Sequence, residues 1–177
     1  LYTSPHYKDF RERIKVNGEL MAEQSVVNFV ATHKAAIEQI KPSFFEITVA
    51  MAFDYFARQQ VDFAVIEVGL GGRLDSTNVI NPILSVITNI GSDHTQFLGE
   101  TLTEMAGEKA GIIKPYVPVV IGESQSEVID VYERTAKRNN TSLIYADRIL
   151  QLKLKEANLE GQVFDLIDHD GKVLFDN

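Results

Sequence analysis

The sequence predicts an α/β fold in which a mostly parallel sheet is flanked by helices and followed by a small antiparallel β tail. Apolar runs of strand length alternate with segments of helical spacing as far as residue 145, which is typical of βα units. The runs 61–68 and 83–90 are mostly apolar, with apolar residues on both faces of the pleat, as in inner parallel strands that helices cover on both faces. After Ala146 the apolar residues recur at every second position, which favours antiparallel strands with one solvated face.

The elements expected before Ala146 follow from this spacing and from the residues that end helices. Residues 1 to about 17 are interpreted as a strand end, a polar loop and a short extended piece. Helices are expected over about 19–40, where Lys41-Pro42 ends the pattern, and over about 43–60, which should be heavily buried. The remaining elements are a strand at 61–68, a strand at 83–90, a helix at 101–114 that Pro115 ends, a strand at 117–121, a helix at 126–139 and a strand at 142–145.

The tail is expected to form an antiparallel meander. Period-two alternation occurs at 150–155, in parts of 163–167 and at 173–175. The segment Asp168-His169-Asp170-Gly171 is most simply a hairpin turn. A calcium loop is the weaker interpretation, because the third acidic position and the distal Glu of that motif are missing. We therefore divide the chain into residues 1–146 and a meander over 147–177 that belongs to the same domain.

Composition narrows the classes of function. A chain of 177 residues with 45% hydrophobic and 24% charged residues is ordinary for one globular α/β domain. A net charge of -8 argues against a nucleic-acid surface, which needs a basic face. The chain contains no cysteine, which excludes thiolate chemistry and fits a reducing cytoplasm. No apolar run approaches the ~20 residues that span a bilayer, and the chain starts without Met, so we expect a fragment of a longer protein.

Two polar side chains near the ends of the two apolar runs form the candidate site. Glu67 lies near the end of the first run and precedes a glycine-rich loop, and His94 follows the second run. Because open α/β sheets bind ligands at the carboxyl ends of their strands, we expect both side chains at one edge. A carboxylate and an imidazole completed by water and phosphate oxygens suit Mg²⁺ or Mn²⁺. The structural alternative is that Glu67 accepts from backbone N–H groups and His94 donates to a carbonyl.

The glycine-rich loop does not match the common nucleotide-binding motifs. The third glycine of the dinucleotide fingerprint is replaced by Leu74, and no Gly-x-x-x-x-Gly-Lys-Ser/Thr occurs. Arg73 and Asp75 are expected to stabilise the loop as a pair, with Thr77 and Asn78 bonding backbone groups. Holding substrate is the alternative role for this pair.

The other candidate side chains have mainly structural interpretations. Lys109, in the helix expected at 101–114, is interpreted as a solvated cation, because a protonated amine has no lone pair for a metal. His6 and His33 are expected to be structural.

Six ordered blocks of sequence resemble the folylpolyglutamate synthase/dihydrofolate synthase family of the Mur ligase superfamily. The resemblance extends from Leu1 to about Ala146, and it implies the central part of an ATPase domain. The phosphate loop and the second domain of that family are missing from these 177 residues. Ser76 also stands where Ala is commoner, and Tyr7 where Leu is commoner. The blocks are Thr3-Ser4-Pro5-His6, Phe10-Arg11-Glu12-Arg13-Ile14, Phe45-Glu46, Glu67-Val68-Gly69-Leu70-Gly71-Gly72-Arg73-Leu74-Asp75-Ser76-Thr77-Asn78, Thr88-Asn89-Ile90-Gly91-Ser92-Asp93-His94 and Glu108-Lys109-Ala110-Gly111-Ile112.

The resemblance implies roles for residues of the candidate site. Ser4 and Glu67 would hold the Mg²⁺ that bridges the ATP phosphates, and Glu67 and His94 a second Mg²⁺. Lys109 matches a lysine that these ligases carbamylate, which would give it oxygens for the second metal. Substrate-binding positions are matched by Ser43, Phe45, Asp75 and Ser76, which correspond to the pterin pocket, and Arg73 is assigned a positioning role. Glu67, His94 and Lys109 are thus the expected catalytic residues.

The activity that the resemblance implies is ATP-dependent ligation of L-glutamate to a pterin or folate carboxylate through an acyl phosphate. The substrates would be ATP, L-glutamate and either dihydropteroate or a reduced folate, and the cofactors ATP and two Mg²⁺. The whole protein is expected to be a cytoplasmic monomer that binds neither nucleic acid nor membrane, and the isolated fragment is expected to be inactive. A peptidoglycan-precursor Mur ligase and a non-catalytic module that binds a pterin or a partner chain are the alternatives.

Overall fold

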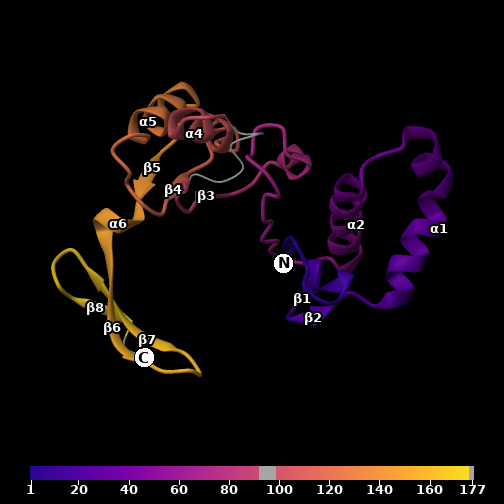
Figure 1. Cartoon of the computed structure of the whole chain (residues 1–177), viewed down its shortest axis with the longest axis horizontal. Helices are drawn as coiled ribbons and strands as arrows, with labels where there is room; N and C mark the ends of the chain where they lie inside the picture. The colour runs from indigo at the N-terminus through magenta and orange to yellow at the C-terminus, as the bar shows by residue number, and fades with distance from the viewer. Residues whose placement is uncertain (92–98, 176–177) are drawn as a thin grey trace. The chain divides into compact units, whose positions relative to one another are not determined.

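A computed structural model of the chain describes residues 1–91 and 99–175. The expected α/β class is confirmed, with a parallel sheet and its helices followed by an antiparallel sheet (Figure 1). Contacts divide the chain into two compact units, Leu1–Ile80 and Asn81–Asn177, and each is described by itself. The boundary expected after Ala146 falls inside the second unit, where the parallel sheet gives way to the antiparallel one.

The first unit is built around two helices and the N-terminal segment. Its helices are α1 (Glu23–Ile40) and α2 (Phe44–Gln59), with the short 3₁₀ helices η1 (Phe10–Arg13) and η2 (Ser76–Val79) and a hairpin of β1 (Lys15–Val16) and β2 (Glu19–Leu20). One face of α2 is buried, at Thr48, Val49, Met51, Ala52 and Phe56, whereas Phe44 is exposed. The heavy burial expected for this helix thus holds for one face. The core of the unit is formed by Tyr2, Ile14, Met21, Phe29, Val49, Met51, Ala52 and Phe56.

The hairpin before α1 corrects the helix expected from residue 19. Asn17 and Gly18 have φ angles of 51° and 87°, and they connect strands in which Val16 pairs with Glu19. An Asn-Gly pair with both residues at positive φ is the preferred two-residue hairpin loop. The helix therefore begins at Glu23, after β2 has ended.

The segments 61–68 and 83–90 differ from the expectation of burial on both faces. Phe63 and Val65 are 78% and 67% exposed, and among the described residues 61–68 pairs with the segment at Tyr2 alone, through a parallel bridge to Ile66. In the second run only Ser85–Ile87 forms a strand, β3, with Val86 51% exposed. A parallel strand is covered on both faces only when helices pack on each, and neither segment has this cover within its unit.

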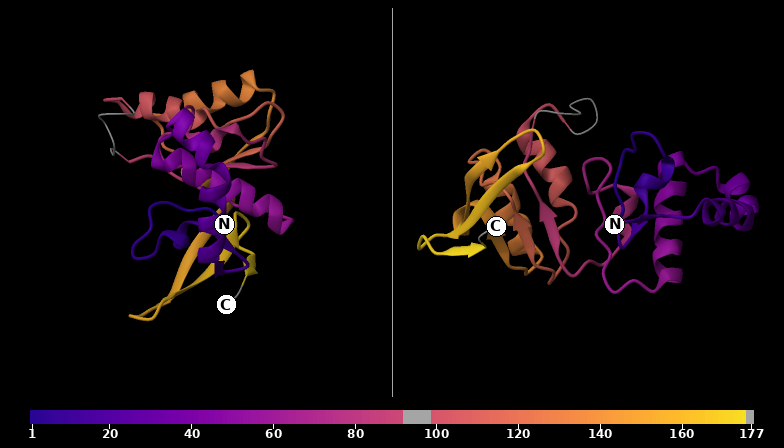
Figure 2. Two further views of the ribbon diagram at one scale, coloured as in Figure 1. Left: turned by 90° about the vertical axis from the view of Figure 1, so that its right-hand side faces the viewer. Right: turned by 90° about the horizontal axis from the view of Figure 1, so that it is seen from below.

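The second unit contains a parallel sheet with two helices. Within the described residues the strand order is β3-β4-β5, where β4 is Val119–Ile121 and β5 is Leu143–Tyr145. The helices α4 (Leu102–Ala110) and α5 (Ile129–Arg138) contact each other and lie over this sheet (Figures 1 and 2). The core between them contains Ile87, Val119 and Ile121 from the strands and Met105, Ala106, Ala110, Val128 and Tyr132 from the helical side.

The ends of α4 have clear local causes. Thr101 caps its first turn, accepting from the Glu104 N–H at 3.2 Å, and the Glu104 carboxylate accepts from the Thr101 N–H at 3.0 Å. This capping box satisfies backbone donors that have no partner inside the helix. The helix ends at Ala110, four residues before the expected end at Lys114, because the chain turns at Gly111.

The tail forms the expected antiparallel meander. After the short helix α6 (Ala146–Ile149), the strands β6 (Leu150–Ala157), β7 (Gln162–Asp168) and β8 (Val173–Phe175) pair in this order. The hairpin turn at 168–171 is confirmed, because Asp168 Oδ1 accepts from the N–H groups of Asp170 and Lys172. Among the described helices, none has the length and apolar character needed to cross a bilayer.

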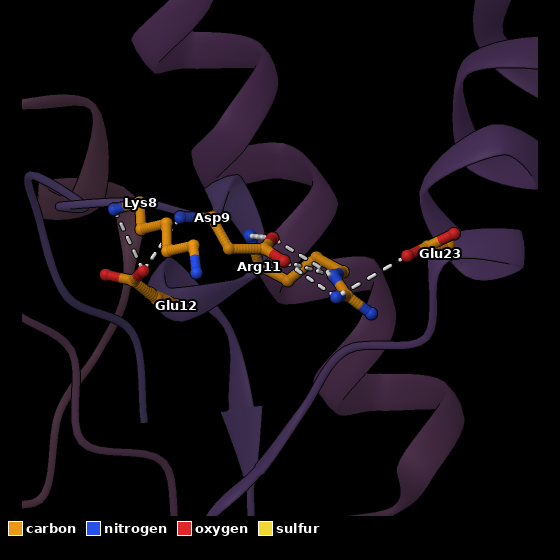
Figure 3. A network of polar contacts seen from close by, with 5 residues as sticks. All are labelled: Lys8, Asp9, Arg11, Glu12 and Glu23. Carbon is orange, nitrogen blue, oxygen red and sulfur yellow. Dashed lines mark hydrogen bonds and ion pairs between the residues drawn. The ribbon is translucent and has the colours of Figure 1, made fainter.

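The polar loop at residues 3–13 is ordered by two carboxylates around η1 (Figure 3). Asp9 binds the Arg11 guanidinium at 2.7 Å and caps η1. Glu12 accepts from the N–H groups of Tyr7, Lys8 and Asp9, which lowers the pKa of its carboxyl. Arg11 also lies 3.5 Å from Glu23 Oε1, so it connects the loop to the first turn of α1.

The hairpin loop allows a test of the positive φ at Gly18. No atom would contact a Cβ at Gly18 or at Gly161, but only Gly18 has a φ in the left-handed region. We expect Gly18→Ala to lower the free energy of unfolding of the full chain by about 1–2 kcal/mol, the cost of that conformation for an L-residue. Gly161→Ala is the control and should change it by much less. Equal losses in urea unfolding would contradict this explanation.

The Asp9–Arg11 contact predicts how the loop responds to acid. The Arg11 side chain, and then its backbone N–H, lower the pKa of Asp9 to about 2. Because this pKa is below the ordinary value near ~4, ionised Asp9 stabilises the folded loop above that value, and the contribution is lost as the pH falls through about 2. Carboxyl NMR titration of Asp9 should give a midpoint of about 2, and Arg11→Met should raise it. An unchanged midpoint in the variant would exclude the guanidinium as the cause.

Candidate functional site

The N-terminal segment brings Ser4 against Glu67. Tyr2 lies beside Ile66 in a parallel bridge, in which the Tyr2 N–H donates to the Val65 carbonyl at 2.8 Å and the Glu67 N–H donates to the Tyr2 carbonyl at 3.0 Å. Tyr2 is fully buried, so this pairing is fixed by the core of the unit. The Ser4 N–H then donates to Glu67 Oε2 at 2.7 Å, although the two residues are 63 positions apart.

These two residues fit the magnesium role that the family resemblance implies for them. A carboxylate and a hydroxyl are hard oxygen ligands of the kind that Mg²⁺ prefers. Among the described residues no three His, Cys, Asp or Glu side chains gather at one point, and His94 lies outside those residues. Lys109 is half-buried in α4 of the second unit, whereas Glu67 belongs to the first. The convergence of Glu67, His94 and Lys109 therefore stays a prediction.

The Asp75 carboxylate folds the glycine-rich loop on itself. Its Oδ2 accepts from the N–H groups of Gly69 and Leu70 at 3.1 and 2.9 Å. Its Oδ1 accepts from the N–H and the hydroxyl of Thr77 at 2.9 and 2.5 Å, which caps η2. Asp75 thus shapes the loop through backbone groups as well as through Thr77.

The other loop residues have less defined roles. Asn78 Nδ2 donates to the Arg73 carbonyl at 3.1 Å, as expected for a residue that bonds the backbone of the loop. Arg73 is exposed and Ser76 is half-buried. The pairing of Arg73 with Asp75 and the contacts of both residues with substrate stay predictions.

The loop approaches the aromatic ring of Phe45 at its first glycine. A Cβ built on Gly69 would lie 2.3 Å from Phe45 Cζ, so only glycine allows this contact. Phe45 lies in the first turn of α2, and its ring centroid is 6.3 Å from that of Tyr2. The expected pterin-pocket residues Phe45 and Asp75 are therefore connected through Gly69.

Ser43, which was also expected to line the pterin pocket, begins α2. Its hydroxyl accepts from the Glu46 N–H at 3.2 Å, and Glu46 Oε2 accepts from the Ser43 N–H at 2.6 Å. This capping box lowers the pKa of Glu46. Ser43 thus has a structural role at the start of the helix that presents Phe45.

Sequence reasoning missed the part played by Arg13 beside this site. Arg13 is buried, and its Nε donates to His6 Nδ1 at 2.9 Å, which agrees with the structural role expected for His6. Its guanidinium lies 5.6 Å from the Phe44 ring centroid. Burial raises the pKa of Tyr2, and the Arg13 charge opposes this. Basic and acidic residues alternate at 11–13, and this pattern does not indicate that Arg13 is buried while Arg11 is more exposed.

Comparison with known proteins identifies the family of this chain. Residues 16–174 match the Mur ligase middle domain. The dihydrofolate synthase/folylpolyglutamate synthase of Bacillus subtilis (strain 168) is 47% identical over 145 residues, which cover 78% of this chain and 34% of that protein. The folylpolyglutamate synthase of Lacticaseibacillus casei is 38% identical over 180 residues, which cover 98% of this chain and 42% of that protein. The chain thus spans less than half the length of these relatives.

A solved structure extends the similarity to three dimensions. The structure of an FPGS–AMPPCP–folate complex matches with a TM-score of 0.88 and 40% identity, covering 96% of this chain and 43% of that chain. The match includes both the helical first unit and the sheets of the second. From the family match over most of its length, the chain belongs to the Mur ligase family, and within it resembles the folylpolyglutamate and dihydrofolate synthases.

Proposed function

We propose that the whole protein containing this chain ligates L-glutamate to the carboxylate of a pterin or folate, using ATP. The observation that supports this most directly is the hydrogen bond from the Ser4 backbone N–H to the Glu67 carboxylate. It joins two residues whose side chains carry oxygen ligands for Mg²⁺, in a chain similar to a structure named for its complex with AMPPCP and folate. The proposal covers dihydropteroate and reduced folates as acceptors, because both present a carboxylate to the same chemistry.

The proposed reaction has two steps. A carboxylate oxygen of the acceptor attacks the γ-phosphorus of ATP, and ADP leaves with the electron pair of the broken bond. The amine of glutamate then attacks the carbonyl carbon of the acyl phosphate, phosphate leaves, and the ammonium that forms releases a proton to water or a side chain. Both steps gather negative charge on phosphate and acyl oxygens, so electrostatic stabilisation is the main demand on the protein.

The residues of this chain are assigned by what they can hold or orient. Ser4 and Glu67 would hold one Mg²⁺ at the ATP phosphates, and Glu67, His94 and a carbamylated Lys109 a second one. When bound, these ions supply positive charge that offsets the charge of the phosphates. Phe45, Asp75 and Ser76 would form the wall of the pterin site, with Ser43 capping the helix that presents Phe45 and Arg73 orienting the acceptor.

Three further properties belong to the same proposal. Residues 1–146 and 147–177 are parts of one ATPase domain, the protein is monomeric, and it works in the cytoplasm, in line with a sequence that lacks cysteine. The 177-residue chain alone does not turn over ATP, because no Walker A motif occurs in it. Glutamate-dependent ADP release by the purified chain would refute this last point.

The role of Glu67 is tested with Glu67→Gln in the full-length protein. The amide oxygen still accepts from the Ser4 N–H, so folding should be preserved, whereas the loss of a charged metal ligand should lower kcat by about 100-fold or more. Glutamate-dependent phosphate release with dihydropteroate and with a reduced folate measures this and identifies the acceptor.

Glu19→Gln is the matched control, because Glu19 is exposed in β2. It should leave turnover unchanged. Wild-type protein that binds the pterin but releases no phosphate would support a non-catalytic binding module, and unchanged turnover in Glu67→Gln would exclude Glu67 as a ligand.

The contact between Gly69 and Phe45 is tested by a double-mutant cycle. Gly69→Ala should lower the free energy of unfolding by about 1–3 kcal/mol, because its methyl group overlaps the Phe45 ring. In a Phe45→Leu background the same substitution should cost less, because the shorter side chain leaves room. Urea unfolding of the four proteins gives the coupling energy. Additive effects would show that the ring does not impose glycine at this position.

A further inference from the structure

We propose that Arg13 is a positioning residue for the metal ion that accompanies the nucleotide, because it holds the chain on both sides of Ser4. Its carbonyl accepts from the N–H of Thr3, one residue before Ser4, and its guanidinium donates to His6, two residues after it. Arg13 would thus determine where the Ser4 hydroxyl lies beside Glu67, without touching metal or substrate. All five residues belong to the first unit, and the inference rests on the function proposed above.

Two oxygen atoms at this point are open to a ligand. The Ser4 N–H donates to Glu67 Oε2, whereas within residues 1–91 and 99–175 the Ser4 hydroxyl and Glu67 Oε1 form no hydrogen bond. Ser4 is half-buried and Glu67 is exposed, so the pair lies at the surface of the unit. Hydroxyl and carboxylate oxygens are ligands that Mg²⁺ prefers. The separation of these two oxygens therefore decides how well they hold one ion together.

Backbone pairing fixes the chain only as far as Thr3. The Thr3 N–H donates to the Arg13 carbonyl at 3.0 Å. In the part of the chain that the structure describes, residues 4–8 form no hydrogen bond with another backbone group. The place of Ser4 therefore depends on contacts that side chains make with this segment.

The Arg13 side chain provides the contact on the far side of Ser4. Its Nε donates to His6 Nδ1 at 2.9 Å. Arg13 is 8% exposed, and its guanidinium lies 5.6 Å from the centroid of the Phe44 ring at the start of α2. His6 is thereby anchored to a buried side chain that packs against a helix.

Beyond His6 the loop is held by a second side chain, Glu12. Its carboxylate accepts from the N–H groups of residues 7–9 (Figure 3). Ser4 thus lies in a short span whose two ends are both fixed. Arg13 contributes to each end of this span, whereas Glu12 acts only on the residues that follow it.

A buried guanidinium is a costly way to fill this position. Among the described residues, the side-chain contacts of Arg13 are with the His6 ring and the Phe44 ring, and neither is a carboxylate. Burial of a charge without an opposite charge is unfavourable, and apolar residues of similar volume often give equal or greater stability. The contact with His6 therefore serves the placement of the segment more than the stability of the core.

The geometry predicts an effect on metal binding that exceeds the effect on folding. A ligand group must be held to within about 0.5 Å to remain productive, and contacts that orient metal ligands typically change affinity or activity by about 10–100-fold. Loss of the guanidinium leaves the backbone bond to Thr3 in place and releases the His6 end of the span. The Ser4 hydroxyl then samples positions from which it cannot share an ion with Glu67.

The test uses the full-length protein with Arg13→Met and His6→Leu, which remove the same hydrogen bond from its two sides. Arg13→Lys keeps the charge and one donor group. Arg58→Met is the matched control, because it removes a basic side chain of the same unit that pairs with Asp54 on the surface of α2. Urea unfolding verifies that each variant is folded. The affinity for Mn²⁺ in the presence of ADP is measured by EPR of the free ion, and hydrogen exchange of residues 2–8 by mass spectrometry.

We expect Arg13→Met and His6→Leu to lower the Mn²⁺ affinity by about 10–100-fold. Exchange at residues 3–4 should become at least about 10-fold faster. High Mg²⁺ should recover much of the turnover, because the ligands themselves remain. Arg13→Lys should lie between the wild type and Arg13→Met, and Arg58→Met should match the wild type.

A double-mutant cycle separates positioning from a general structural effect. Ser4→Ala removes the hydroxyl and keeps the N–H that donates to Glu67. Because Arg13 acts by placing that hydroxyl, Arg13→Met should lower the Mn²⁺ affinity of Ser4→Ala by no more than about 2-fold. The large loss is expected only where the hydroxyl is present.

Three results would overturn the inference. Unchanged Mn²⁺ affinity in folded Arg13→Met and His6→Leu would mean that this contact does not place a ligand. Equal losses in both backgrounds of the cycle would leave Arg13 a purely structural residue. A wild type that binds Mn²⁺ no better than Ser4→Ala would exclude the hydroxyl as a ligand. If the wild type binds Mn²⁺ with ADP but does not ligate glutamate, the proposed function fails, and the cycle still decides the role of Arg13.

Discussion

The pairing of Tyr2 with the segment 65–67 is the constraint on which the first unit depends. It buries Tyr2 completely, sets the direction in which the chain leaves towards Ser4, and satisfies backbone groups on both segments. Because Tyr2 also lies near Phe45, the same pairing connects the start of the chain to α2 and to the loop that begins at Gly69. Glu67 is exposed at the end of its apolar run, and the Ser4 N–H that this pairing delivers donates to its carboxylate.

Much of the fold could be predicted from the sequence because the period of the apolar residues changes between elements. The order of strands and helices from β3 to β5 and the antiparallel tail follow that period directly, as does the turn at Asp168. The Asn17-Gly18 pair is an equally clear hairpin signal in the sequence. The prediction nevertheless begins the helix at about residue 19, because the apolar pattern of α1 extends back to that point. The exposure of Phe63 and Val65 could not be predicted, because burial depends on neighbours that a single strand does not specify.

The residues of the candidate site likewise differ in how far the local sequence indicates them. Glu67 and Ser4 lie in conspicuous positions, one after an apolar run and the other in a block that resembles a known family, and the structure places them in contact. Arg13 acts through its contacts with His6 and Phe44, and nothing in its local pattern distinguishes it from an ordinary polar residue. Asp75 is intermediate: its place in the loop was evident, but its bonds to Gly69 and Leu70 depend on how the loop closes.

The loops at the carboxyl ends of β3, β4 and β5 are joined in series by the hydrogen bonds of Gly122 with Ile87, of Gln125 with Ile90 and of Ser124 with Asp147. Each contact supplies a partner for a group on the adjoining loop. Movement of one loop therefore breaks its contacts with the next. We therefore expect the described residues of these loops, 88–91, 122–125 and 146–147, to open together as one cooperative unit. A ligand bound by any one of these segments would reduce the motion of all three.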